Sequence, residues 1–328
     1  MSTSNNDDSG DGLGALLKGA GLFAVAAAAW GVLNNMSASS EALERSSKVQ
    51  VLFERAIAHA QQAETQQAVQ LFSEILKIAP SHAPTYNQLA WIYATSYSFD
   101  QALIFANKAV EFATNLFDEV NSITTLGDIY YMMGTSNFNQ LRLLSNALAQ
   151  YEASESLYRE AIRLAGSHDL FQLPLIKLSN CLNSKGAVFD SFEDCPKSVE
   201  SFQLSYQVYQ YNPYPAINLA CISSRLQNKQ QMRYWLEIGV PLVIDSFYWQ
   251  SSHLVSVMLN DLDFENYRDE VLDLLVGHGK ITQLEYRRYL ESWLRRKHNP
   301  QSNRDFRGAI FVNYAEQVDG EQVGTQHR

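Results

Sequence analysis

The feature that most constrains the fold of this chain is a recurrence of small and apolar residues at a spacing of 34. Ala68 and Ala102 are separated by this spacing, as are Ala56 and Ala90. Within each copy, apolar residues recur at intervals of three and four, which is the period of an amphipathic helix. A helix–turn–helix unit of this length cannot bury its apolar face alone, so successive copies must stack on one another. The sequence therefore predicts an all-α repeat fold.

Two copies of the unit carry a recognisable set of residues. The first, at about 49–82, has Ala56, Ala68, Phe72, Ile75 and Pro80, with His59 where a tyrosine is usual; the second, at about 83–113, has Tyr86, Leu89, Ala90, Tyr93, Ala102, Ala106 and Ala109. These units resemble the tetratricopeptide repeat (TPR) family. The resemblance implies a right-handed α-solenoid of about five helix pairs followed by C-terminal capping helices.

Later copies depart further from the pattern. A third contains Leu126, Tyr130 and Ala161, and about 15 extra residues within it are expected to lengthen both helices or to add a loop. A fourth, at 170–211, is interpreted as degenerate, with an irregular insert near 185–196, and a fifth begins at Asn212.

The chain is expected to end its repeats with a distinct terminal unit. The run from Asp261 to Asp269 resembles the end-of-group repeats of bacterial TPR arrays. The pair Thr282 and Glu285 is a capping-box signature, which predicts a last helix through about Lys297.

The N-terminal residues form a separate region. Residues 1–12 are acidic and expected to be disordered, and residues 13–36 are predicted to form an Ala/Gly-rich hydrophobic helix ahead of a repeat domain at 39–298 and a polar tail at 299–328. The uncharged span from Gly19 to Ser40 has 22 residues, and about 20 helical residues cross a bilayer. The predicted membrane or self-association residues are Ala20, Ala24, Ala28 and Trp30, because small residues at every fourth position let helices approach closely. An Ala-rich helix inside a soluble oligomer is the alternative.

Charge and cysteine content bear on location. Lys18, Arg45 and Lys48 lie within or after the apolar span and no Lys or Arg precedes it, so the positive-inside rule predicts a cytoplasmic repeat domain. Three cysteines without a Cys-x-x-Cys pair suit a reducing compartment. We expect a membrane-associated protein with a cytoplasmic repeat domain, or alternatively a soluble cytoplasmic one.

The sequence contains no recognisable catalytic or cofactor-binding constellation. None of the seven histidines forms a His-x-x-x-His pair, and no Gly-rich loop follows a strand. The acidic run at 261–269 has no glycine for the turn of a calcium loop. A net charge of −10 disfavours nucleic-acid binding, which depends on neutralising phosphates. We expect no enzyme activity, no cofactor and no metal.

The TPR resemblance implies where a partner would bind. In that family the first helix of each pair lines a concave groove. The residues that this places in the groove are Phe53, Ile57, Gln61, Asn87, Trp91, Thr95, Thr124, Asp128 and Tyr131. Such a groove favours an apolar or aromatic peptide or helix. Alternatively, Phe53 and Ile57 pack on a helix preceding Val49, or an N-terminal or C-terminal segment of the chain fills the groove.

The sequence thus favours a protein-binding scaffold or adaptor, tethered to a membrane through its N-terminal helix. Two alternatives remain open at this point. One is a membrane-inserting effector whose hydrophobic helix is controlled by the repeat body. The other is a soluble oligomeric regulator whose N-terminal helices form a bundle.

Overall fold

The computed structural model describes residues 40–140, 142–166, 172–243 and 251–297. Every regular element within these ranges is helical, as the 34-residue period predicts. The segments 1–12, 13–36 and 299–328 lie outside the described residues, so the predictions made for them stay predictions.

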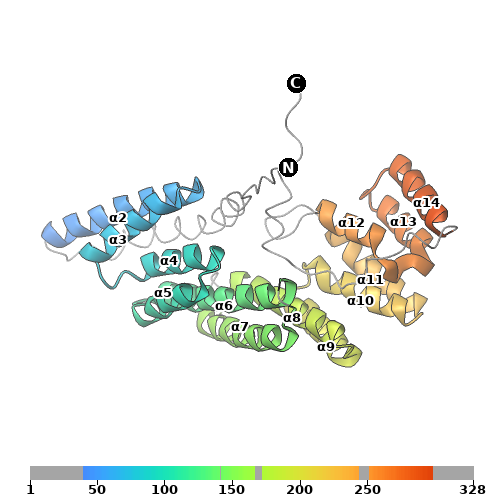
Figure 1. Cartoon of the computed structure of the whole chain (residues 1–328), viewed down its shortest axis with the longest axis horizontal. Helices are drawn as coiled ribbons and strands as arrows, with labels where there is room; N and C mark the ends of the chain where they lie inside the picture. Colours follow the sequence, from blue (N-terminus) through green and yellow to red (C-terminus); the bar gives the residue numbers. More distant parts are fainter. Residues whose placement is uncertain (1–39, 141, 167–171, 244–250, 298–328) are drawn as a thin grey trace, which may run out of the picture. The chain divides into compact units, whose positions relative to one another are not determined.

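Most of the helices form consecutive pairs that pack side by side (Figure 1). The pairs are α2 (Ser40–Gln61) with α3 (Thr65–Ile78), α4 (Ala83–Thr95) with α5 (Phe99–Glu111), α6 (Leu116–Asn139) with α7 (Leu144–Ala165), α8 (Gln172–Ser191) with α9 (Cys195–Val208), and α10 (Pro213–Arg225) with α11 (Lys229–Gly239). The terminal elements are the 3₁₀ helix η2 (Val240–Leu242), α12 (Ser251–Asn260), the 3₁₀ helix η3 (Leu262–Tyr267), α13 (Arg268–Gly277) and α14 (Gln283–Lys297).

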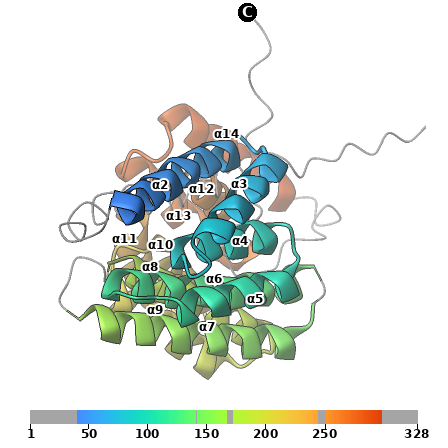
Figure 2. The same ribbon diagram turned by 90° about the vertical axis from the view of Figure 1, so that its left-hand side faces the viewer.

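These elements belong to two compact units, with α6 and α7 divided between them. The first unit holds residues 40–132 and 160–166 among those described. The second holds the described residues of 133–159 and 172–297. The N-terminal pair illustrates the packing in the first unit, because Figures 1 and 2 both show α2 lying beside α3.

The turn inside each pair repeats the same backbone geometry. Ala63 and Tyr97, 34 residues apart, have φ angles of 58° and 57°; Glu193 and Gln227, also 34 apart, have 60° and 56°. The residue after each of these donates its backbone N–H to a carbonyl five residues earlier, as Glu64 does to His59 at 2.9 Å and Asn228 does to Ser223 at 2.9 Å. This is the Schellman arrangement that ends a helix. The 34-residue period is therefore a property of the backbone as well as of the sequence.

The fourth pair is regular, which corrects the expectation of an irregular insert near 185–196. Lys185 lies inside α8, the short turn at 192–194 is built like the turns of the first two pairs, and α9 begins at Cys195. The difference has a physical reason. This pair has Gly186 against the ring of Phe202, so the small residue at the helix crossing is a glycine and the large one an aromatic.

The third pair settles the alternative that the sequence left open. Its helices α6 and α7 have 24 and 22 residues, whereas α4 and α5 have 13 each. The extra residues lengthen both helices. The capping box is also confirmed, because the Thr282 hydroxyl accepts the Glu285 N–H and the Glu285 carboxylate accepts the Thr282 N–H.

Replacing Glu193 or Gln227 by glycine is expected to stabilise the protein by about 0.5–1 kcal/mol each. Both residues hold a left-handed backbone conformation that strains a side-chain-bearing residue, and the relief exceeds the entropy that glycine adds to the unfolded chain. Urea denaturation followed by circular dichroism measures the change. The exposed Glu200 inside α9 is the matched control, since Glu200→Gly is expected to cost about 1 kcal/mol. A loss of stability in all three variants would contradict the assignment of strain.

Candidate partner-binding surface

The repeated turns define which positions are equivalent in different pairs. Tyr97 and Glu193 are the same turn residue in α4/α5 and α8/α9, and they are 96 positions apart. A residue of α2, α4, α8 or α10 can therefore be matched with its counterparts by offsets of 34, 96 and 34. We call the row predicted to face a partner the inner row; it contains Phe53, Ile57 and Gln61 on α2, and Asn87, Trp91 and Thr95 on α4.

The structure divides the predicted groove residues into buried and accessible groups. Phe53, Ile57, Asn87, Thr124 and Tyr131 are each less than a tenth exposed. Gln61 is exposed, and Trp91, Thr95 and Asp128 are half-buried. The accessible part of the row in the first unit is thus one tryptophan among polar side chains.

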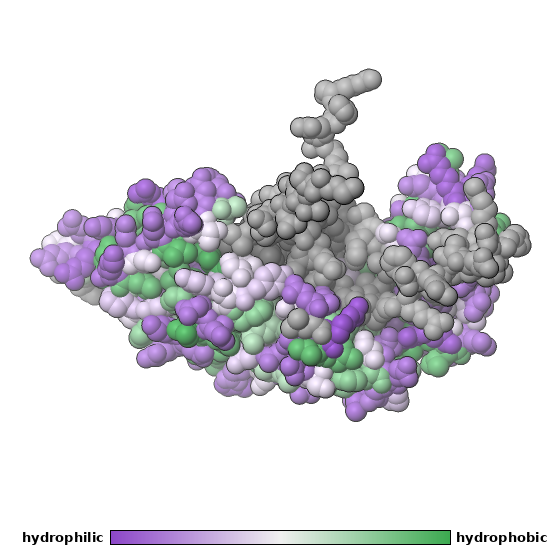
Figure 3. All heavy atoms as spheres, in the orientation of Figure 1, coloured by the Kyte–Doolittle hydropathy of each residue, from purple (hydrophilic) through white to green (hydrophobic). Residues whose placement is uncertain are grey.

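Phe53 is buried by neighbours from the following elements. Its ring lies edge-on to Phe72 of α3 at 5.8 Å between centroids, and to His82 before α4 at 5.5 Å. The helix α2 is continuous from Ser40, so no separate helix precedes Val49. The first nine residues of α2 are all exposed, and the side of α2 visible in Figure 3 is largely hydrophilic. Phe53 therefore packs forward onto its own repeat and the start of the next.

A hydrogen bond between first helices recurs in both units. Asn87 Nδ2 donates to Ser122 Oγ at 3.1 Å, and Asn218 Nδ2 donates to Asn183 Oδ1 at 2.9 Å. Each bond spans 35 residues, and Asn87 and Asn183 occupy equivalent positions. The recurrence fixes α6 relative to α4 in the first unit in the same way as α10 is fixed relative to α8 in the second.

This relation adds residues that sequence reasoning missed. Asn121 and Thr125 lie 34 positions after Asn87 and Trp91, and both are half-buried. The signal for them was the 34-residue spacing itself, continued past the second unit. In the second unit the same row is Asn183, Ala187 and Ser191 on α8, and Ile217, Cys221 and Arg225 on α10. These were missed because an insert was expected in the fourth pair.

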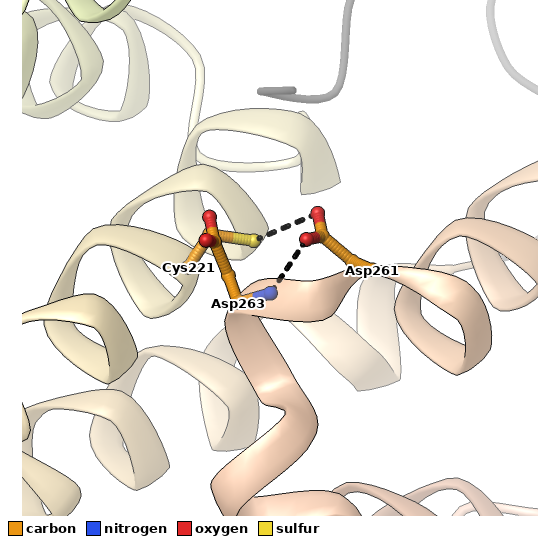
Figure 4. A group of neighbouring side chains, drawn as sticks. All are labelled: Cys221, Asp261 and Asp263. Carbon is orange, nitrogen blue, oxygen red and sulfur yellow. Dashed lines mark hydrogen bonds between the residues drawn. The ribbon is translucent and has the colours of Figure 1, made fainter. Parts of the chain in front are cut away.

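The row on α10 ends in a cluster of polar side chains from two elements (Figure 4). The Cys221 thiol donates to Asp261 Oδ2 at 3.7 Å, and the other oxygen of Asp261 accepts the backbone N–H of Asp263 at 2.9 Å. Burial raises the pKa of Cys221 well above its usual range, and burial also raises the pKa of the Asp261 carboxyl. The thiol is therefore a protonated hydrogen-bond donor.

The donor set of this cluster was tested for a metal ion. Ligand atoms of Cys221, Asp261 and Asp263 all lie within 4.8 Å of one another. However, the Arg225 guanidinium lies 3.4 Å from Asp263 and 2.5 Å from Asp190, so the protein itself supplies the neutralising cation. Metal-binding thiols are deprotonated, whereas the environment here disfavours a thiolate. The cluster does not fit a metal, and its bonds attach η3 to α10.

The other buried thiol is also structural. Cys181 donates to the Tyr151 carbonyl at 3.2 Å, and burial raises its pKa to about 12. A nucleophilic cysteine needs a lowered pKa. Neither Cys181 nor Cys221 has the environment of a catalytic thiol.

No helix within the described ranges is long and apolar enough to cross a bilayer. The predicted hydrophobic helix at 13–36 was not part of that search, because it lies outside those ranges.

Comparison with known proteins gives similarity at the level of solved structures. No protein-family profile and no curated protein matches the chain. PilF of Pseudomonas aeruginosa has a TM-score of 0.45 at 16% identity, covering 79% of this chain and 95% of PilF. PilW, a type IV pilus biogenesis factor, has 0.43 at 13%, covering 75% and 98%; YrrB, a TPR protein with an unusual peptide-binding site, has 0.37 at 16%, covering 63% and 92%.

At these values the similarity supports no inference about function. The fold rests instead on the chain's own geometry, in which turns, cross-repeat hydrogen bonds and buried small residues recur at the repeat spacing. The chain has the fold of a tetratricopeptide-type helical repeat protein.

Proposed function

We propose that this chain is a non-enzymatic scaffold that binds a segment of a protein partner along the inner row of its first helices. The observation that carries the proposal is the accessible part of the row in the first unit. There, the half-buried Trp91 is accompanied by polar side chains of successive repeats: Gln61, Thr95, Asn121, Thr125 and Asp128. A row of this kind offers one aromatic anchor and several main-chain hydrogen-bonding groups to an extended or helical segment.

The chemistry of the row suggests the partner. Trp91 suits an apolar or aromatic side chain of the partner, as the sequence also predicted. Phe53, Ile57 and Tyr131, being buried, would act by holding the first helices in place. Because the chain carries a net charge of −10 and Asp128 lies in the row, a neutral or basic segment is favoured over an acidic one here.

The substitution Trp91→Ala is expected to weaken partner capture about tenfold or more, because a central aromatic anchor often contributes about 2 kcal/mol. Captured proteins from a lysate are compared quantitatively between wild-type and variant chains. Tyr97→Ala is the control, because Tyr97 is an equally accessible aromatic residue that lies in a turn outside the row. Equal capture by wild type and Trp91→Ala would remove the row from the proposal.

We further propose that residues 13–33 attach this scaffold to a membrane, on the sequence grounds given above. The full chain is expected to sediment with membranes and to be released by detergent. A chain starting at Ser37 is expected to remain in the supernatant. Full-length protein that stays in the supernatant without detergent would contradict the tether and favour the soluble alternative.

A further inference from the structure

The inner row of the last repeat is already covered by the chain's own residues. Cys221 and Arg225 on α10 are the counterparts of Trp91 and Thr95 on α4. In Figure 4 the side chain of Asp261 points toward Cys221 from the neighbouring element, with Asp263 beside it. A segment of the chain thus lies where the proposed function places a partner.

The contacts between α10 and this segment involve both its side chains and its main chain. Ser224 Oγ donates to the carbonyl of Asp263 at 2.5 Å, and Arg225 Nε lies 3.4 Å from the Asp263 carboxylate. The Cys221 thiol donates to the carboxylate of Asp261. The residue that follows, Phe264, is fully buried. Three side chains on consecutive turns of α10 therefore recognise two acidic residues and one carbonyl.

The segment also has its own local order. Asp261 caps η3 by accepting the N–H of Asp263, and its carbonyl accepts the N–H of Phe264 at 3.3 Å. Arg268 donates to the carbonyls of Met258 and Asp261 at 2.7 and 2.5 Å. A turn that is ordered by its own bonds loses little conformational entropy on binding, so it can act as a compact ligand.

We propose that α10 carries a recognition site for an acidic turn of the form Asp-x-Asp-Phe, and that residues 261–264 occupy this site in cis. The site is formed by Cys221, Ser224 and Arg225, with Asp190 of α8 holding the guanidinium from the other side. A partner that presents the same turn competes with residues 261–264. This inference rests on the proposed role of the inner row, but it concerns the second unit and a different ligand chemistry.

A labelled peptide with the sequence of residues 259–269 tests the site by fluorescence anisotropy. In a full chain with Phe264→Ala, which weakens the cis segment, the peptide is expected to bind about tenfold tighter than to wild type. Adding Arg225→Ala is expected to reduce this binding by about fivefold or more. The control is Arg233→Ala in the same background, since Arg233 lies on α11 and pairs with Glu237.

Equal binding to wild type and Phe264→Ala, or binding that ignores Arg225→Ala, would overturn the proposal. Hydrogen exchange of the wild-type chain gives a second test that does not depend on how the variant folds. The amides of Asp263 and Phe264 are expected to exchange by local opening, faster than those in the middle of α10. Exchange at the rate of α10 would show that the segment is not releasable. Because these readouts do not involve Trp91, their failure is distinct from failure of partner capture in the first unit.

Discussion

Replacing Gly186 by alanine is expected to lower the free energy of unfolding by about 2 kcal/mol. A Cβ atom at Gly186 would lie 2.6 Å from Cε1 and 2.7 Å from Cδ1 of Phe202, closer than side-chain atoms approach one another. Phe202 is fully buried between α8 and its neighbours, so its ring has no free space to enter. Overpacking of this kind costs about 1–3 kcal/mol, and the better helix propensity of alanine offsets only part of it. Urea denaturation followed by circular dichroism measures the loss.

Gly277→Ala is the matched control for this prediction. Gly277 ends α13, and a Cβ built there meets nothing within 4 Å. This variant is expected to be neutral or slightly more stable. Adding Phe202→Leu to Gly186→Ala is expected to recover part of the lost stability by shortening the side chain opposite the new methyl group. If Gly186→Ala and Gly277→Ala behave alike, the packing of α8 on α9 is looser than described.

The contact between Gly186 and Phe202 also explains what sequence reasoning could and could not find. The first two pairs were recognised by alanines at fixed positions, such as Ala56 and Ala90. In the fourth pair, Gly186 occupies the same position. What close packing conserves is the combined volume of the two facing side chains, not the residue type. A search for alanines therefore loses the repeat in this pair, whereas the turn residue Glu193 keeps it in register.

The candidate site was predictable only in part for a related reason. The 34-residue spacing places Phe53 and Trp91 in one row, but it does not tell which of them remains accessible. That depends on neighbours such as Phe72 and His82, which cover the ring of Phe53. The contact of Cys221 with Asp261 spans 40 residues and follows no period, so no sequence pattern could have indicated it.

Acidification from pH 7 to pH 5 is expected to destabilise the first unit by about 2 kcal/mol through His82. Burial lowers the pKa of this histidine from 6.5 to about 4, and its ring lies against Phe53 while Nδ1 is 2.8 Å from Thr85 Oγ1. Below pH 6.5 the unfolded chain binds a proton that the folded chain does not. The stabilisation is therefore complete above pH 6.5 and decreases as the pH falls toward 4. Urea denaturation at several pH values, with hydrogen exchange to localise the change to α2–α4, measures it.

Asparagine at this position provides the discriminating variant, because the protein already uses it in an equivalent place. Asn212 caps α10 as His82 caps α4, and its side chain accepts the N–H of Tyr214 at 3.1 Å without a titratable group. His82→Asn is expected to flatten the pH dependence between 6.5 and 4. His278→Asn, which alters an exposed histidine after α13, is expected to leave the dependence unchanged. A steep loss of stability that persists in His82→Asn would assign the acid sensitivity to other groups and show that the His82 ring accepts a proton in the folded repeat.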